Sequence, residues 1–395
     1  MSALAERWTL DKDRFFWMYN AGDRAPRRVE LDNTTGFWNV HSYAAALYVL
    51  NNPDIFSSGT SRLMGEVDDS TITQIDPPRH TAMRKLVTRA FTARATTRLE
   101  PRTRAIVNDL LAKVADRKNF DLVAELAYPL PITVIAELLG VPVSDYGLIK
   151  GWVDAMLSGT MEFSLVNRDN ELQSELEYVL EQARHIEDYI RELSRQRRVK
   201  PGNDLLTGLV QAEVDGERLT EKEVTSFANA LLVAGHVTTT LLIGSTMLCL
   251  DAYPQINRAV REDRDLIPAL LEESLRYFPP ISSTVRLTNA QVELEGATIG
   301  PDQLVQVWIP AANRDGQVFA DGHEFQLARD PNPHLAFGHG AHFCIGAALA
   351  RQEARIAINT LLDVFPELRC DPENPPAFMT SPNLNGVTSL PVLVS

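Results

Sequence analysis

The chain has 395 residues, with 38 Lys and Arg against 52 Asp and Glu, and a net charge of −14; 45% of its residues are hydrophobic. This hydrophobic content excludes an intrinsically disordered chain, and the acidic balance argues against a general binder of nucleic acid or anionic membrane. The length allows two or three domains at about 150 residues each. Because no linker or repeat marks a boundary, we expect one large domain over residues 1–395.

The predicted elements are mostly helices, with a few short strands late in the chain. Amphipathic periodicity predicts, in chain order, helices over Arg79–Phe91, Pro101–Val114, Ile132–Leu139, Glu171–Arg197, Ile256–Tyr277 and Ala347–Val364. Strand-like runs follow one another at Val285–Leu287, Val292–Leu294, Leu304–Ile309 and Leu390–Val394. The expected fold class is therefore mainly α with small β-sheets attached to a helical body.

One apolar stretch, Ala228–Leu250, is long enough to cross a bilayer, which takes about 20 residues. It contains Asn229, His236 and three consecutive threonines, and Thr220 with Glu223 forms a capping box before it. We therefore predict a helix through the interior of a globular protein and not a membrane span. The first residues lack the apolar core of a signal peptide and the three cysteines are far apart, so we expect a cytoplasmic protein without disulfides.

The most informative segment is Phe337–Gly346, which reads FGHGAHFCIG and precedes the helical pattern from Ala347. It presents Cys344 just before a helix N-terminus, where the helix dipole and free N–H groups favour a thiolate. Gly338 lets the loop turn, and Gly346 leaves room for a flat cofactor. For an isolated cysteine, a buried and inert thiol is the ordinary interpretation.

The pattern F-G-x-G-x-H-x-C-x-G resembles the haem-binding loop of the cytochrome P-450 family. The resemblance implies the fold of that family, with a long central helix over the haem. It implies that Cys344 is the thiolate ligand of the iron in haem b. His342 would bind a haem propionate, Phe337 would pack beside the thiolate, and Gly338 and Gly346 would belong to the cofactor site.

A second match is Glu273-Ser274-Leu275-Arg276, which resembles the E-x-x-R motif of the family's K helix. Glu and Arg three residues apart are ordinarily a solvated surface pair. The resemblance implies a buried pair that braces the haem side. The family often adds an arginine further along, but the corresponding position here is Glu324, so Arg314 or Arg329 would take that part.

A third match, Asp76 to Arg84, resembles the start of the family's C helix and implies that His80 and Arg84 reach a propionate. The two residues lie on one helical face. Arg286 fits the family's other propionate arginine. Each residue alone is an ordinary surface charge, but two buried carboxylates need positive partners.

A fourth match is Ala234-Gly235-His236-Val237-Thr238-Thr239 within the long helix. The resemblance implies that Ala234 and Gly235 leave room for O₂ and that Thr238 holds water near it; alternatively, Thr238 only bonds to the preceding turn. Val237 stands where the family usually has an acid. His236 lies about 200° from Thr238 around the helix, so it is a poor replacement. Water held by Thr238, or a substrate hydroxyl, is predicted to complete the proton relay.

The segment Arg79–Arg104 carries eight Arg and Lys residues and one Glu, a local charge of +7 in an acidic chain. It is either a solvated helix face or, as the resemblance implies, a surface that attracts an acidic ferredoxin or flavodoxin. Electrons would then come from NAD(P)H through such a partner and its reductase.

The resemblance implies a soluble monooxygenase that inserts one oxygen atom from O₂ into a C–H or C=C bond. The substrate would be a sizeable, mainly apolar molecule, similar to those of members that tailor polyketides and macrolides. The segments that vary in the family offer pocket candidates: Leu63, Met64, Met156, Leu231, Ile281 and Asn383. Two alternatives stay open, a peroxide-driven or non-oxygenase haem enzyme suggested by Val237, and a haem-binding sensor without catalysis.

Overall fold

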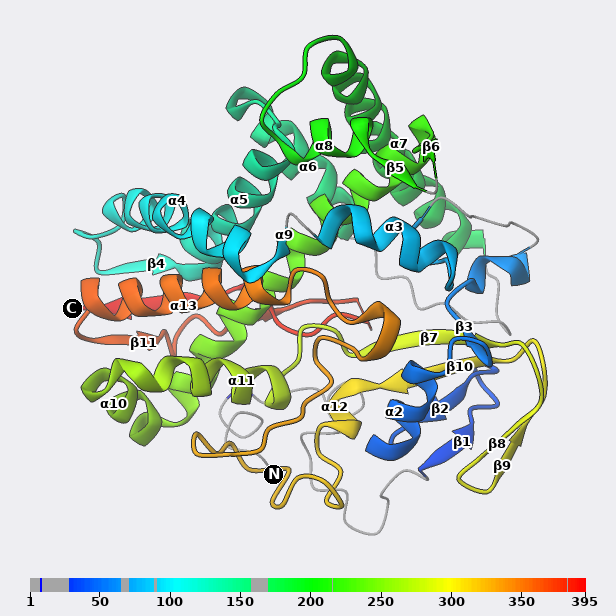
Figure 1. Cartoon of the computed structure of the whole chain (residues 1–395). Coiled ribbons are helices and arrows are strands. Elements are labelled where there is room, and N and C mark those ends of the chain that lie inside the picture. The colour runs from blue at the N-terminus through cyan, green and yellow to red at the C-terminus, as the bar shows by residue number, and fades with distance from the viewer. Residues whose placement is uncertain are drawn as a thin grey trace.

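The structure is a computed structural model that describes residue 8 and residues 28–64, 71–88, 91–157, 170–214, 216–381 and 383–395. Helices form the body of the molecule, and a small sheet lies against one side of it (Figure 1). This is the expected mainly α architecture with small sheets.

The helices of the described residues are α2 (Tyr43–Asn51), α3 (Arg79–Thr88), α4 (Ala93–Ala112), α5 (Pro129–Leu139), α6 (Tyr146–Leu157), α7 (Asn170–Val199), α8 (Leu205–Gln211), α9 (Glu221–Ala252), α10 (Pro254–Glu262), α11 (Ile267–Tyr277), α12 (Ile309–Ala312) and α13 (Ala347–Val364). The predicted helical segments are all present, but the one expected from Pro101 begins at Ala93, with Pro101 inside it, and α2, α6, α8 and α12 were not predicted. The prediction of one helix over 256–277 is wrong. Asp263 ends α10 and caps the next turn through its side chain, and Pro268 begins α11, so the chain changes direction there.

The strands are short. They are β1 (Val29–Leu31), β2 (Trp38–Val40), β3 (Phe56–Ser57), β4 (Asn119–Asp121), β5 (Glu213–Val214), β6 (Glu217–Arg218), β7 (Ser283–Thr288), β8 (Val292–Leu294), β9 (Ala297–Ile299), β10 (Leu304–Trp308), β11 (Leu368–Cys370), β12 (Ala377–Phe378), β13 (Val387–Ser389) and β14 (Pro391–Val394). The largest sheet has the order β1-β2-β10-β7-β3, in which only β2 and β10 are parallel. The four predicted late strands are present as β7, β8, β10 and β14. The early strands β1 to β6 were not predicted, because they are too short for alternation to reveal them.

Helix α9 runs obliquely through the helical body and packs against α5, α7, α11 and α13 (Figure 1). Thr220 and Glu223 form the predicted capping box at its start. The helix is apolar and long enough to cross a membrane, yet 78% of its most apolar window is buried inside the protein. The prediction of an interior helix is confirmed.

Candidate active site

A cavity of about 380 Å³ lies between α9 and the loop that precedes α13. It brings together most of the predicted site residues: Leu231, Ala234, Gly235 and Thr238 from α9, Ile281, Arg286 of β7, and Phe337, Gly338, His342, Cys344 and Gly346 from the loop. The thiol and the small residues of α9 therefore face each other across one space, as the sequence predicts.

Cys344 is held by the backbone of its own loop. Its N–H donates to the carbonyl of Phe337 at 2.8 Å. Gly340 has a positive φ of 68°, and a Cβ there would lie 2.7 Å from the carbonyl oxygen of Leu50, so the tight loop requires glycine. Burial raises the pKa of Cys344, whereas the N–H of Gly346 and the charge of Arg84 act to lower it. A thiolate here needs a further positive partner, which an iron ion supplies.

Arg84 has a different place from the predicted one. Its guanidinium donates to the carbonyl oxygens of Ala341, at 3.0 Å, and of Phe343, and it does not line the cavity. The cause is the close packing of α3 on the cysteine loop, which brings those carbonyls within reach. In this structure Arg84 therefore fixes the loop that carries Cys344.

Arg286 and His342 line one end of the cavity, and His80 packs behind His342 without lining it; we call these three residues the cationic cluster. The rings of His80 and His342 are 4.0 Å apart, and His342 Nε2 lies 3.0 Å from Ser58 Oγ. Within the described residues, Arg286 donates only to Thr284 Oγ1 and the Val285 carbonyl, and His80 Nδ1 has no partner.

The electrostatics of the cationic cluster favour an anion. Burial, His80, Arg286 and Arg84 together lower the pKa of His342 to about 3, while burial and Arg84 lower the pKa of His80. Burial also lowers the pKa of Arg286, and Asp76 acts against this. The carboxylates of a haem would pair with the charge of Arg286 and would favour protonation of the two histidines, so the residues present fit that cofactor.

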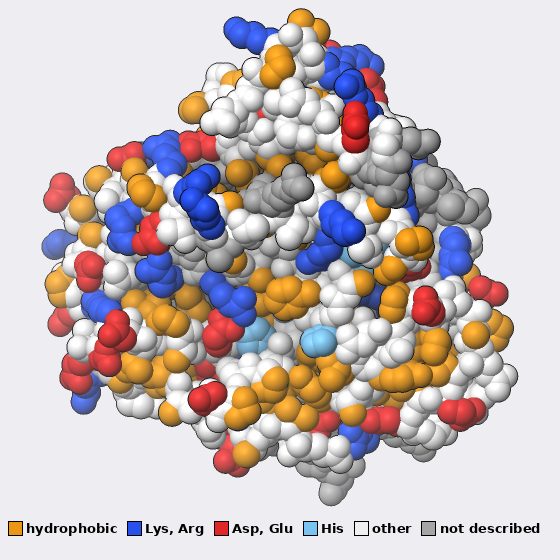
Figure 2. Space-filling model, in the orientation of Figure 1, with side chains coloured by type: hydrophobic (Ala, Val, Ile, Leu, Met, Phe, Trp, Pro, Cys, Tyr) orange, Lys and Arg blue, Asp and Glu red, His pale blue; other side chains and the backbone are white. Residues whose placement is uncertain are grey.

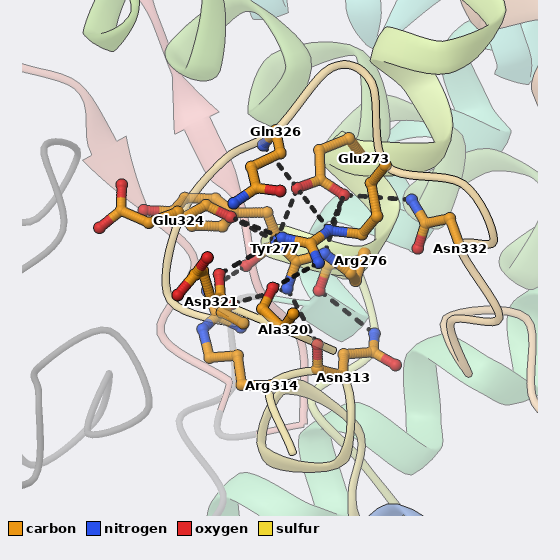
Figure 3. Close-up of polar contacts among 12 residues, drawn as sticks. Glu273, Arg276, Tyr277, Asn313, Arg314, Ala320, Asp321, Glu324, Gln326 and Asn332 are labelled. Carbon is orange, nitrogen blue, oxygen red and sulfur yellow. Dashed lines mark hydrogen bonds and ion pairs between the residues drawn. The ribbon is translucent and has the colours of Figure 1, made fainter. Parts of the chain in front are cut away.

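Glu273 and Arg276 of α11 form a buried hub, which the sequence predicts as a buried pair (Figure 3). Arg276 has no exposed surface and uses all five of its N–H donors, on both carboxylate oxygens of Glu273 and on three backbone carbonyls. The carbonyls belong to Asn313, Gly322 and Glu324. The hub therefore ties α11 to the segment that leads into the cysteine loop.

The further arginine of this hub is Arg329. Its Nε lies 3.2 Å from Glu273, whereas Arg314 donates to the carbonyls of Pro310 and Tyr277. Glu324 stands where the family often has an arginine. It contributes its backbone carbonyl and not its side chain to the hub, so glutamate is tolerated at this position (Figure 3).

On α9, Thr238 donates to the carbonyl of Ala234 at 2.7 Å, which is the bond to the preceding turn, and it also lines the cavity. A Cβ on Gly235 would lie 3.3 Å from Ile135 Cγ1, so this glycine also permits close packing on α5. Val237 does not face this cavity and lines a different one together with His236. The prediction that His236 and Thr238 point to different sides of the helix is therefore confirmed.

The substrate-pocket candidates are only partly brought together. Leu231 and Ile281 line the cavity. Leu63 is 41% exposed because the short 3₁₀ helix Thr60–Met64 turns it to the surface, and Asn383 is exposed and accepts from Ser283 Oγ. The side chains of Met64 and Met156 lie outside the described residues.

Sequence reasoning missed Glu353 of α13, which lines the cavity and is 2% exposed. Burial raises its pKa to about 8, so its carboxyl is mostly protonated at pH 7. The available signal is an acid within the apolar stripe of the helix, one turn after Leu349. Ile135, Leu242 and Leu275 also line the cavity, and as apolar helix residues they carry no distinguishing signal.

The basic segment is more strongly paired than its composition suggests. Arg79 pairs with Glu223, Arg102 with Glu137 at 2.5 Å, and Arg104 with Glu100 at 3.0 Å. Within the described part of the chain, Lys85, Arg94 and Arg98 are exposed and have no acidic partner; Arg89 lies outside it. Lys and Arg side chains are spread over the face formed by α3, α4 and α13, with acidic residues among them (Figure 2).

Comparison with known proteins agrees with this geometry. The family model described as cytochrome P450 matches residues 32–393. The chain is 41% identical to cyclomarin C epoxidase of Salinispora arenicola, with 91% of each chain covered, and 38% identical to the erythromycin C-12 hydroxylase of Saccharopolyspora erythraea, with 91% of this chain and 89% of that one covered. A solved post-tailoring hydroxylase of himastatin biosynthesis superposes with a TM-score of 0.88 at 46% identity, with both chains fully covered.

The chain belongs to the cytochrome P450 family. It is a haem-thiolate monooxygenase that takes its electrons from redox partners, of the kind that tailors bacterial secondary metabolites.

Proposed function

We propose that Cys344 is the thiolate ligand of the haem and that His80, Arg286 and His342 hold its propionates. The observation that carries this assignment is the cavity with the thiol on one wall, the cationic cluster at one end and the small residues of α9 opposite. When bound, the haem supplies the activation of O₂. The overall reaction places one oxygen atom in the substrate and reduces the other to water, which consumes two electrons and two protons.

The substrate is a sizeable, mainly apolar secondary metabolite such as a polyketide or macrolide, oxidised at a C–H or C=C bond. Support comes from the apolar lining by Leu231, Leu242 and Ile281 with only a few polar groups, such as Thr73 and Thr238. The names of the relatives include both an epoxidase and hydroxylases. Ala234 and Gly235 leave space beside the substrate, and Thr238 holds a water by the lone pairs that its bond to Ala234 leaves free.

Electrons come from NAD(P)H through an acidic ferredoxin or flavodoxin and its reductase. The docking surface is the face with Lys85, Arg94 and Arg98, whose charges are not neutralised by acids of the described chain. We place the protein in the cytoplasm. We also propose that residues 1–395 form one domain, and the family match over residues 32–393 supports this.

The test compares Cys344→Ser with Cys249→Ser, a buried cysteine of α9 that does not line the cavity. We expect Cys344→Ser to lose the ferrous–CO band typical of thiolate ligation and all oxygenation, and Cys249→Ser to keep both. Candidate metabolites are screened by the spin-state change of the haem, and products formed under ¹⁸O₂ are identified by mass spectrometry. A thiolate band retained in Cys344→Ser would overturn the assignment.

The wild-type holoenzyme also distinguishes a monooxygenase that uses redox partners from the peroxide-driven alternative. We expect turnover with NAD(P)H and redox partners to exceed turnover with hydrogen peroxide alone. Val237 does not line the haem cavity, so its apolar side chain leaves the lining of that cavity unchanged. Product formation with peroxide alone would favour the alternative.

A further inference from the structure

A second cavity, of about 450 Å³, lies behind α9. We call it the rear chamber; the residues that matter here are His236, Val237 and Thr240 of α9, Tyr128, and Lys150 and Asp154 of α6. Ala234, Gly235, Thr238 and Thr239 of the same helix line the candidate haem cavity. Helix α9 is therefore a wall, one helix thick, between the two spaces.

His236 marks the inner end of the rear chamber. Its side chain has no exposed surface, and neither ring nitrogen has a hydrogen-bond partner among the described residues. Burial lowers its pKa to about 4, so at pH 7 the neutral ring offers one donor and one acceptor. Leaving both ring nitrogens buried without a partner is unfavourable. The adjacent space is large enough for several waters at about 30 Å³ each, which would pair both nitrogens.

The outer end of the chamber is charged and reaches solvent. Asp154 accepts from the hydroxyl of Tyr128 at 2.5 Å and from Lys150 at 2.6 Å, and the Lys150 and Asp154 side chains are about half exposed. The ring of Tyr128 meets the ring of His236 edge-on at 4.1 Å between centroids. Tyr128, Lys150 and Asp154 thus place polar groups between the surface and His236, in a chamber whose other lining residues, such as Leu241, Phe378 and Met379, are mostly apolar.

Three consecutive hydroxyls lead from the rear chamber around α9. Thr240 donates to the carbonyl of His236 at 3.1 Å, Thr239 to that of Gly235 at 3.3 Å, and Thr238 to that of Ala234 at 2.7 Å. Each hydroxyl keeps lone pairs that accept from water. Successive residues are turned by about 100°, so the set begins in the rear chamber at Thr240 and ends in the haem cavity at Thr238.

We propose that the rear chamber is a water-filled proton inlet, in which protons pass from Asp154 and Tyr128 to water at His236, and along water bound to Thr240 and Thr239 to Thr238. Each group in the chain gives one proton as it receives another, so none changes charge in a completed transfer. The inference rests on the proposed function, because only oxygen reduction in the haem cavity consumes the protons. It also assigns a route that needs no acid at Val237.

The test is Thr240→Val, which removes the hydroxyl and keeps the shape of the side chain. The matched control is Thr246→Val: Thr246 is also buried in α9 and bonds to the preceding turn, at 2.8 Å, but lines neither cavity. Oxygen-dependent NAD(P)H consumption is measured in H₂O and D₂O with excess ferredoxin and reductase. Thr240→Val should slow the reaction about tenfold and should raise the solvent isotope effect. The expected factor is smaller than the full contribution of a proton-transferring side chain, because water partly replaces the lost hydroxyl.

Thr240→Ser should restore the rate, and Thr246→Val should match the wild type. A crystal structure of the wild-type holoenzyme should show ordered waters on both nitrogens of His236. A dry chamber, or a wild-type rate in Thr240→Val, would overturn the inlet. The ferrous–CO spectrum is recorded for every protein. Absence of the thiolate band in the wild type would contradict the proposed function. A normal band together with an unchanged rate in Thr240→Val would contradict the inlet alone.

Discussion

Two buried polar centres near the cysteine loop differ in how completely their groups are paired. In the hub, Arg276 uses every N–H donor, and both oxygens of Glu273 accept from side chains, Oε1 also from the backbone N–H of Gln326. In the cationic cluster, Arg286 and His80 lack an acidic partner within the described residues, and on the rear face of α9 the ring of His236 has no hydrogen-bond partner among them. Complete pairing makes the hub a brace of the fold, whereas the unpaired groups lie where we propose that a cofactor and water bind.

The strongest test of this contrast is Arg276→Leu in the hub. It leaves the carboxylate of Glu273 buried with only the donors of Arg329, Asn332 and the Gln326 backbone N–H. We expect a loss of about 3–5 kcal/mol in the free energy of unfolding, measured by urea denaturation of the holoenzyme. The double variant Glu273→Leu with Arg276→Leu should lose less than the two single losses added together; additive losses would show that the pair does not act as a unit.

A second test uses the pH dependence of stability. Because the folded pKa of His236 is about 4 and the ordinary value is 6.5, the unfolded chain binds the proton first as the pH falls. Stability from this group is therefore present above pH 6.5 and is lost toward pH 4. Between pH 7 and pH 5 the wild type should lose about 2 kcal/mol more than His236→Gln. Equal losses in urea titrations at the two pH values would contradict a neutral, buried His236.

A third test concerns the cationic cluster. Arg286→Leu removes a buried charge without a carboxylate partner, so the fold should tolerate it, while haem should dissociate about tenfold faster, equivalent to about 1.4 kcal/mol. Haem transfer to an acceptor protein measures the rate. Arg261→Leu, in α10 and partly buried away from the cavity, is the control and should not change it. Similar rates for the two variants would remove Arg286 from the cofactor site.

The smallest expected effect concerns paired and unpaired charges at the surface. Lys85→Glu and Arg98→Glu should each slow electron transfer from an acidic ferredoxin a few-fold at low salt, and the difference should vanish as salt is added. Arg102→Glu, which removes a charge already paired with Glu137, should slow it less at the same salt. Stopped-flow reduction measures the three rates. Equal rates in all three variants would contradict docking on this face.

The sequence predicts well what depends on local pattern. The bounds of α13, the placing of Cys344 before it, and the capping box of α9 follow from residues close together in the chain. The wheel angle between His236 and Thr238 likewise follows from helix geometry.

What depends on the path of loops or on distant packing is not predictable from local pattern. Arg329, and not Arg314, joins the hub because the segment after α12 folds back on α11, and Arg84 binds loop carbonyls because α3 packs there. The rear chamber is built from residues near Tyr128, in α6 and in α9, and from Phe378 to Thr388, which lie far apart in sequence, so only the folded chain reveals it.

One face of α9 lines each of the two cavities, so its sequence is constrained on both faces. The same helical register determines which residues face which cavity. Substitution on one face can proceed while the other stays unchanged, as Val237 shows beside an intact Thr238. A one-residue insertion or deletion would instead rotate all that follows by about 100° and turn residues of each lining away from the space they face. This helix is therefore expected to diverge among relatives by replacement and to keep its length.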